Sequence, residues 1–290
     1  MSASVWPAPA KLNLFLHVLG RRADGYHELQ SIFQFLDLED RITFTPRSDG
    51  HVQRSRGHAQ VEEEADLVVR AARLLKAETG TPLGVEIAVD KRIPVGGGLG
   101  GGSSDAATTL LALDRIWDLG LGRQRLAELG LRLGADVPVF VHGRAAWAEG
   151  VGERLQSVEL ETPWYLVISP GCTVSTAQVF SHPALTRDSA PLRIRDFLTP
   201  GGGQVLAVRA ILGRAGNDCE AVVRALYPPV DAALRWLSRH GDARMTGTGA
   251  SVFAPFSDRA AAQRCLESLP GGWRGFVARG MNRSAVLALV

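Results

Sequence analysis

The residues best suited to chemistry form a glycine-rich segment, residues 93–107, in which six of the seven positions from 96 to 102 are glycine. Glycine leaves backbone N–H groups uncovered and tolerates the positive φ angles that wrap a loop around a compact ligand. Ser103, Ser104 and Asp105 follow as candidate N-caps, and residues 106–113 have the composition of a helix. Because free N–H groups and a helix dipole both favour anions, this segment predicts a phosphate-binding site.

Two known motifs and a plain linker compete as interpretations of this loop. Three of its glycines satisfy G-x-G-x-x-G, but a dinucleotide-binding fold opens with that motif and places an acidic residue at a strand end about 20 residues later. Here Asp114 and Asp118 fall within or just after the predicted helix. A Walker A loop needs a lysine before its hydroxyl residue, whereas Gly102 precedes Ser103. The apolar helix that follows at once disfavours a flexible linker.

A second group of polar residues lies on a predicted strand, residues 10–19. One face of this strand carries leucine and valine, and the other carries Lys11, Asn13, Phe15 and His17. The polar face either meets solvent or lines a cleft, and the pattern alone leaves both open. Lysine occurs only at positions 11, 76 and 91, so a lysine at a chemically useful position is more informative here than usual.

Asp136 is the third candidate, in the segment Gly-Ala-Asp-Val-Pro at residues 134–138. Pro138 disfavours helical geometry at Val137, so we expect Asp136 in a turn between a helix and a strand. Apolar sequence follows it, and a buried carboxylate needs a partner or a role. The alternative is an aspartate that bonds only its own turn.

The elements that must position these residues alternate along the chain in an α+β pattern. A polar stretch within residues 41–62 is expected to be a solvated loop or hairpin, and a second small-residue loop covers residues 245–251. We place a domain boundary near residue 160, which gives domains 1–160 and 161–290. Helices are expected at residues 65–79, 106–117, 123–133, 220–226, 230–239 and 260–269, and further strands at 32–38, 41–45, 85–89, 163–169, 252–255, 276–278 and 285–290.

Composition narrows the class of protein. The 290 residues are 46% hydrophobic and 21% charged with a net charge of +2, which gives no electrostatic reason to expect nucleic acid or membrane partners. Cys172, Cys219 and Cys265 are odd in number and widely spaced, as expected for reduced thiols. With no signal-peptide pattern and no apolar run long enough to span a bilayer, we expect a cytoplasmic protein, either a monomer or a homodimer.

Taken together, these motifs resemble the GHMP kinase family of small-molecule kinases. They are most similar to its members that act on a cytidine-diphosphate sugar alcohol. The resemblance implies two α+β domains, a ribosomal-protein-S5-like N-terminal domain and a ferredoxin-like C-terminal domain, with the active site in the cleft between them. The segments that carry it are residues 9–18, 24–40, 94–107, 134–140, 150–153, 217–220 and 245–254.

The resemblance also implies the reaction, which is transfer of the γ-phosphoryl group of ATP to a hydroxyl group. Asp136 matches the family's catalytic acid, which accepts the hydroxyl proton, and Lys11 matches the lysine that lowers the hydroxyl pKa and anchors that acid. Mg²⁺ is expected to bridge phosphate oxygens, with Ser104 as a candidate contact. The residues matched to ATP binding are Lys91, Pro94, Val95, Gly96, Gly97, Gly98, Leu99, Gly100, Gly101, Gly102, Ser103 and Ser104.

The second substrate has its own matched residues. Tyr26 and Phe180 match an aromatic pair that sandwiches cytosine, and His27 matches the residue that reads the edge of the base. Asn13 and Thr176 match further contacts with this substrate.

Some positions depart from the family pattern. Asp66 stands where an asparagine near the adenine is usual, so the adenine contact is in doubt. Thr246 and Thr248 replace two serines and keep their hydroxyl groups. The alternatives are another GHMP kinase that acts on homoserine or mevalonate, a non-catalytic nucleotide-binding protein of the same fold, and a dinucleotide-dependent oxidoreductase.

Overall fold

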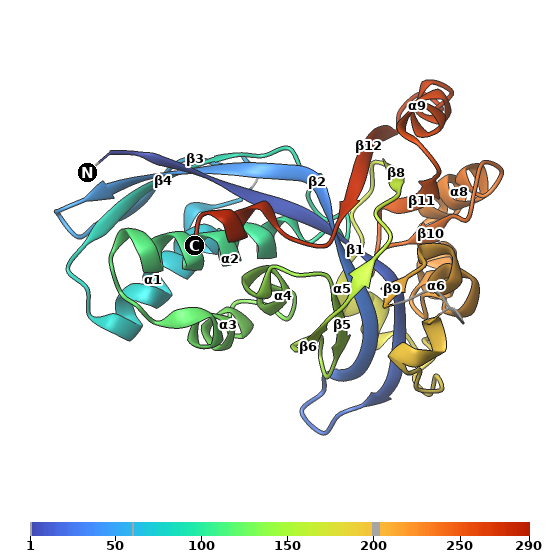
Figure 1. Ribbon diagram of the computed structural model, residues 1–290, viewed down its shortest axis with the longest axis horizontal. Coiled ribbons are helices and arrows are strands. Elements are labelled where there is room, and N and C mark those ends of the chain that lie inside the picture. The colour runs from blue at the N-terminus through green and yellow to red at the C-terminus, as the bar shows by residue number, and fades with distance from the viewer. Residues whose placement is uncertain (1, 60, 199–203) are drawn as a thin grey trace.

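The computed structural model describes residues 2–59, 61–198 and 204–290, which form two lobes joined by one long β-hairpin (Figure 1). The strands of this hairpin are β1 (Ser4–Arg21) and β2 (His27–Arg47), of 18 and 21 residues. They pair antiparallel from Ser4 opposite Phe44 to Arg21 opposite His27. Such a length is possible because both strands carry apolar residues throughout and are covered by other elements in each lobe.

The N-terminal lobe is a sheet with helices on one face (Figure 1). β4 (Gly84–Asp90) pairs antiparallel with the second half of β2, and β3 (Val52–Arg56) lies parallel to β4 at the edge. The expectation of a loop or hairpin in residues 41–62 is therefore wrong, because β3 joins the sheet as an edge strand whose side chains are largely solvent-exposed. The core between the two layers takes its apolar residues from the strands and from the helices α1 (Leu67–Thr79), α2 (Gly101–Ile116), α3 (Gly122–Leu131) and α4 (Val137–His142). The short 3-10 helix η1 (Glu63–Ala65) precedes α1 and buries no residue.

The C-terminal lobe is built around β8 (Trp164–Ser169), with β11 (Val252–Phe256) on one side and β12 (Arg274–Met281) on the other. All three strands confirm the expected positions. β10 (Arg244–Met245) extends the sheet beyond β11. Helices pack around this sheet: α5 (Thr176–Ser181), η2 (Ile194–Phe197), α6 (Val208–Arg214), α7 (Glu220–Leu226), α8 (Pro228–Leu237) and α9 (Arg259–Glu267).

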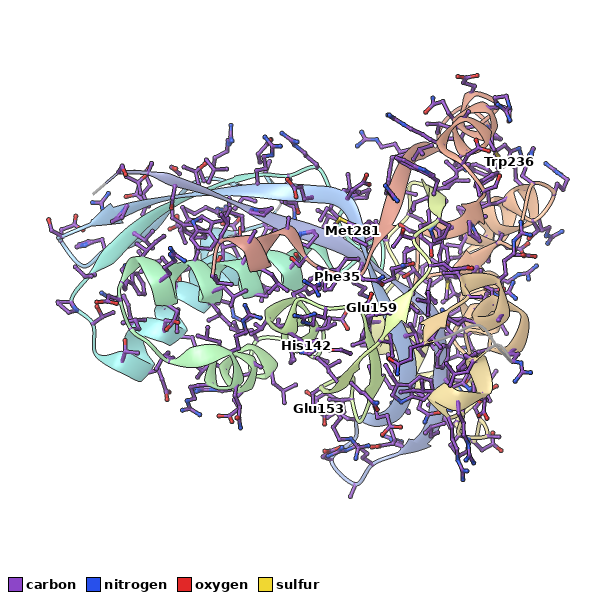
Figure 2. All side chains as sticks on the ribbon, viewed as in Figure 1. Phe35, His142, Glu153, Glu159, Trp236 and Met281 are labelled. Carbon is purple, nitrogen blue, oxygen red and sulfur yellow. The ribbon has the colours of Figure 1, made fainter. Side chains whose placement is uncertain are left out.

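The β-sheets of the two lobes are continuous at the junction. β12 pairs with β2 through Gly280 opposite Leu36 and Met281 opposite Phe35, so one sheet continues from lobe to lobe. Figure 2 shows Phe35 and Met281 side by side at this point. The smaller strands of this region are β5 (Ala146–Glu149), which pairs with β2 and with β6 (Arg154–Ser157), and the separate pair of β7 (Glu159–Leu160) and β9 (Val205–Leu206).

The C-terminal segment returns to the N-terminal lobe. The expected strand at residues 285–290 is wrong, because η3 (Ala285–Ala288) is a short 3-10 helix whose first turn is capped by the Ser284 hydroxyl. Val286 is buried in the core of the N-terminal lobe. The division into residues 1–160 and 161–290 therefore stays a prediction, because this segment crosses it. None of the helices described is long and apolar enough to pass through a lipid bilayer.

Candidate active site

The glycine loop forms a concave row of backbone amides. Gly96, Gly98 and Gly100 have φ of +72°, +73° and +72°, while Gly97 and Leu99 between them do not have positive φ. Alternation of left-handed and ordinary backbone turns successive N–H groups toward one side, which is the geometry of an anion-binding nest. Gly98 is also required by space, since a Cβ there would lie 2.4 Å from the carbonyl oxygen of Thr246.

The helix behind the loop begins earlier than expected. α2 starts at Gly101 with Gly100 at its N-cap, and the amide of Ser104 donates to the Gly100 carbonyl oxygen at 2.8 Å. Ser103, Ser104 and Asp105 are thus inside the first turns rather than at the N-cap, because the left-handed Gly100 already supplies the change of direction. The positive end of the α2 dipole therefore begins at the loop itself, which favours an anion there.

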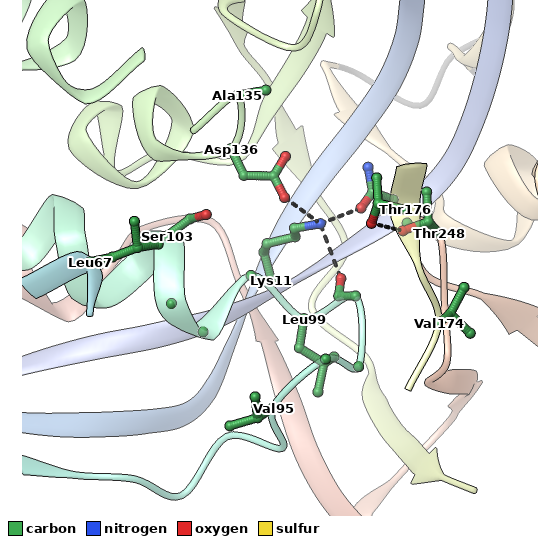
Figure 3. A pocket seen from close by; sticks show the side chains of 18 of the residues that line it. Lys11, Leu67, Val95, Leu99, Ser103, Ala135, Asp136, Val174, Thr176 and Thr248 are labelled. Carbon is green, nitrogen blue, oxygen red and sulfur yellow. Dashed lines mark hydrogen bonds and ion pairs between the residues drawn. The ribbon is translucent and has the colours of Figure 1, made fainter. Parts of the chain in front are cut away.

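Lys11 and Asp136 meet beside this loop, as Figure 3 shows. The Lys11 Nζ lies 3.2 Å from the Asp136 Oδ2, although 125 positions separate the two residues. Lys11 also donates to the Asn13 Oδ1 at 2.5 Å and to the Gly98 carbonyl oxygen at 3.1 Å. The ammonium is buried and the carboxylate is 37% exposed, so the pair presents its acidic partner to the cavity.

Asp136 does not lie in a turn between a helix and a strand. Residues 137–142 form α4, with Asp136 at its N-cap and Pro138 in the first turn. Proline is tolerated there because the N–H groups of the first turn have no partner inside the helix, and its fixed φ suits helical geometry. The backbone at the start of α4 therefore sets the place of Asp136, and Lys11 is the cation that its carboxylate meets.

A network of hydrogen bonds holds Asn13 in place. Its side-chain amide donates to the Ser31 Oγ at 2.8 Å, and its backbone amide donates to the Thr246 Oγ1 at 2.9 Å. Ser31 in turn donates to the carbonyl oxygen of Phe15. The predicted sharing of one face by Lys11, Asn13, Phe15 and His17 is wrong for the last two, because a register shift between residues 13 and 16 reverses the alternation. Phe15 lies in the core, and the His17 ring lies edge-on to it at 5.2 Å and does not line the cavity.

The second small-residue loop lies against the first. Thr246 also donates to the Gly98 carbonyl oxygen at 3.4 Å, and the Ser251 amide donates to the Gly97 carbonyl oxygen at 3.0 Å. The side chain of Asn217 donates to the backbone carbonyl oxygens of Met245 and Gly247 and so fixes the second loop from behind. Residues 217–218 also look like an N-cap for the helix at 220–226 in the sequence, but that expectation is wrong, because Cys219 is the N-cap of α7 and Asn217 supports the loop instead.

Lys91 lines the cavity but is already paired. Its Nζ contacts a carboxylate oxygen of the buried Asp40 and lies 2.7 Å from the Asp105 Oδ2. Burial alone lowers the pKa of Lys91, but the two carboxylates outweigh it and raise the pKa above its usual value. Burial raises the pKa of Asp105 well above its usual range, with Asp40 nearby acting in the same direction. The positive charge of Lys91 is therefore largely neutralised by Asp40 and Asp105 within the protein.

The residues matched to the base are only partly brought together. His27 stacks on Phe180 with ring centroids 5.1 Å apart, and Tyr26 is 61% exposed. Of these three residues, only Phe180 lines the cavity. The structure thus does not assemble Tyr26 and Phe180 as a sandwich. Burial lowers the pKa of His27 below its usual value, and the cations of Arg187 and Arg21 lower it further.

One cavity of about 590 Å³ connects the loop, the Lys11–Asp136 pair and the acceptor side. This volume suits a ligand of nucleotide size. Thr176 lines it and shares a hydrogen bond of 2.8 Å with the Thr248 hydroxyl (Figure 3). At the opposite end Asp66 lines it, where its carboxylate caps α1 and lies 2.5 Å from Arg54.

A metal ion finds few protein ligands in this cavity. Ser104 is fully buried with its Oγ unpartnered and does not line the cavity, so its expected metal contact receives no support from its position. Ser103 does line the cavity. Within the described ranges, no cluster of three or more histidine, cysteine, aspartate or glutamate side chains is suited to a metal. This donor set fits Mg²⁺ held mainly by phosphate and water oxygens.

Sequence reasoning missed several residues that line the cavity or hold it together. Ser31 and Phe33 line the cavity from β2, where they lie opposite Leu16 and Asn13. The Ser31 hydroxyl accepts a hydrogen bond from the Asn13 side chain, and the Lys11 ammonium lies 5.4 Å from the centre of the Phe33 ring. Arg187 donates to a ring nitrogen of His27. The pairing register of β1 with β2 would have revealed the first two, but nothing in the sequence near Arg187 indicates its contact.

Known proteins are similar to this chain over nearly its whole length. Family models named GHMP kinases N terminal domain and GHMP kinases C terminal match residues 66–144 and 203–275. A curated relative from Alkalilimnicola ehrlichii, named 4-diphosphocytidyl-2-C-methyl-D-erythritol kinase, is 59% identical over 282 residues, which cover 97% of this chain and 92% of the relative. A crystal structure of 4-(cytidine 5'-diphospho)-2C-methyl-D-erythritol kinase has a TM-score of 0.81 at 34% identity and covers 96% of this chain and 99% of its own. Homoserine kinase from Cytophaga hutchinsonii has a TM-score of 0.73 at 16% identity, with 99% and 96% covered, which is a likeness of fold alone.

Proposed function

The chain belongs to the GHMP kinase family, and from this premise we propose that it transfers the γ-phosphoryl group of ATP to the 2-hydroxyl of 4-diphosphocytidyl-2-C-methyl-D-erythritol. In the cell this reaction would serve the non-mevalonate route to isoprenoid precursors. The observation that carries the proposal is the meeting of the Lys11–Asp136 pair with the glycine loop in one cavity.

The chemistry follows from that juxtaposition. The acceptor oxygen forms a bond to the γ-phosphorus, the bond from phosphorus to the leaving ADP oxygen breaks, and the hydroxyl proton passes to the carboxylate of Asp136. Lys11 orients that carboxylate, and its positive charge favours the negative charge that develops on the attacking oxygen. The amides of residues 96–102 hold the transferred phosphate against this pair.

Mg²⁺, when bound, would neutralise part of the phosphate charge. Its contacts in this chain would come from the Ser103 hydroxyl and from water, with the remaining ligands supplied by ATP. The single proton released in the proposed transfer is accepted by Asp136.

The acceptor would lie on the side of the cavity formed by Thr176, Thr248 and Phe180. Stacking of a base on Phe180 is worth about 1–3 kcal/mol and is the same for every base, so hydrogen bonds must choose among bases. We assign that choice to His27, which stacks on Phe180. For Tyr26 to cover the base, its exposed ring would have to move toward Phe180 when the substrate binds.

The test is turnover by the purified protein with ATP, Mg²⁺ and each of three acceptors. We expect ADP release and a phosphorylated product only with the cytidine-diphosphate sugar alcohol, and not with homoserine or mevalonate. Cytidine diphosphate should compete with the acceptor and not with ATP. Faster turnover of homoserine or mevalonate would contradict the proposal, and a protein that binds ATP without any turnover would be a non-catalytic member of the fold.

A further inference from the structure

We propose that Arg187 is a positioning residue that selects cytosine over uracil by fixing which ring nitrogen of His27 carries the proton. This inference rests on the proposed function, because it names how the acceptor site distinguishes two bases of the same size. Arg187 lies between α5 and η2, and it does not line the cavity. It therefore acts through His27 rather than on the substrate.

The contact between the two residues has a fixed direction. The Arg187 Nε lies 3.2 Å from the His27 Nε2. A guanidinium group carries only donors and stays protonated in proteins, so the His27 Nε2 must supply the lone pair. The other two nitrogens of Arg187 donate to the carbonyl oxygens of Phe180, His182 and Leu185. Four hydrogen bonds thus hold the guanidinium in one orientation.

The surroundings of His27 leave its second nitrogen available. The side chain is buried, and burial together with Arg187 and Arg21 favours the neutral ring by lowering its pKa. A neutral imidazole whose Nε2 is an acceptor carries its proton on Nδ1. Among the residues that the structure describes, none forms a hydrogen bond with this Nδ1. His27 does not itself line the cavity, but its ring stacks on Phe180, which does, so a base that extends past Phe180 would meet this N–H.

A fixed N–H donor separates the two pyrimidines. The N3 atom of cytosine accepts a hydrogen bond, whereas the N3 atom of uracil carries a hydrogen and donates. The Nδ1–H of His27 therefore pairs with cytosine and opposes uracil at this atom. In the other tautomer Nδ1 would be an acceptor, and the preference would reverse. A histidine free to change tautomer would accept both bases, so the selectivity depends on Arg187.

The experiment compares the cytidine acceptor with its uridine counterpart in the full-length protein. We expect the wild type to favour cytidine by at least about 100-fold in kcat/KM. Arg187→Met removes the donor and should reduce this ratio to about tenfold or less through KM for the cytidine acceptor, while KM for ATP stays unchanged. Arg187→Lys keeps a cationic donor and should retain most of the ratio.

The ratio separates this role from a purely structural one. If Arg187 only supports the end of α5, its loss weakens both acceptors equally and leaves the ratio unchanged, which would overturn the inference. Nitrogen NMR of the histidine rings gives a direct reading, with the signals of His27 assigned by their loss in His27→Gln. We expect an unprotonated Nε2 in the wild type and a mixture of tautomers in Arg187→Met.

Two failures can be told apart. A wild type that shows no turnover with the cytidine acceptor refutes the proposed function. Turnover together with an unchanged ratio, or with a protonated Nε2 in the wild type, refutes only the role of Arg187.

Discussion

Replacing Asp136 by asparagine tests the proposed chemistry with the smallest change in shape. Asparagine keeps the size of the side chain and an oxygen that can face the Lys11 ammonium at 3.2 Å, but it cannot take a proton from the acceptor hydroxyl. Lys11 keeps its hydrogen bonds to Asn13 and to the Gly98 carbonyl oxygen. The ammonium is therefore not left without acceptors, and the fold should survive.

The expected loss of stability is much smaller than the expected loss of kcat, so the two can be measured separately. The Asp136 side chain is 37% exposed, and the buried Lys11 ammonium keeps two other acceptors, so the free energy of unfolding should fall by about 1 kcal/mol or less. Loss of a general base lowers kcat by about 10²–10⁴-fold, which is about 2.7–5.4 kcal/mol in the activation barrier. The amides proposed to bind ATP lie in the glycine loop, which this substitution leaves unchanged.

The assay is release of ADP at saturating ATP and acceptor, with ATP affinity from calorimetric titration and stability from urea unfolding. Asp90→Asn is the matched control, because Asp90 is 42% exposed, lies 2.9 Å from Arg92 and does not line the cavity. We expect the control to retain wild-type kcat. A kcat for Asp136→Asn within about tenfold of the wild type, in a folded protein that binds ATP, would refute the assignment of the base.

The glycine loop, the paired lysine and a buried thiol give three further tests. Gly98→Ala places a methyl carbon 2.4 Å from the carbonyl oxygen of Thr246 at a φ of +73°. The resulting strain should lower ATP affinity by about tenfold or more in calorimetric titration. Unchanged affinity would contradict the close packing of the two loops. Lys91→Met leaves the buried Asp40 without its cation and should lower the free energy of unfolding by about 3–5 kcal/mol in urea, whereas a loss under about 1 kcal/mol would show that this cation is not needed. Burial raises the pKa of Cys219 to about 12. Iodoacetamide at about pH 8 should therefore leave this thiol unlabelled in mass spectra of the native protein. Early labelling of Cys219 would contradict its burial.

The chemical groups were more predictable than the local structure around them. Spacing and composition alone indicate the anion site, because a row of glycines before an apolar helix has few other uses. They do not indicate where α2 begins, since Gly100 and Ser103 are both acceptable N-caps and only the left-handed backbone of Gly100 decides. The proline after Asp136 misled for a related reason, because a proline in the first turn of a helix and one that ends a helix look alike in sequence.

Contacts between distant segments could not be predicted from the residues alone. The meeting of Lys11 with Asp136 was expected only from the family resemblance, since it depends on the fold of both lobes. The bulge that turns Phe15 into the core depends on cross-strand register, which strict alternation cannot reveal. Arg187 carries no motif, and only the structure places it against His27.

Because η3 packs into the N-terminal lobe, the chain cannot be cut near residue 160 without removing part of that lobe's core. A chain that ends after residue 160 would keep the glycine loop but lack Val286, which is buried in the core of the N-terminal lobe. The remaining fragment would lack the long hairpin whose Leu12 and Leu14 complete its own interior. Neither half therefore holds a complete core, and separately expressed halves are not expected to fold as autonomous domains.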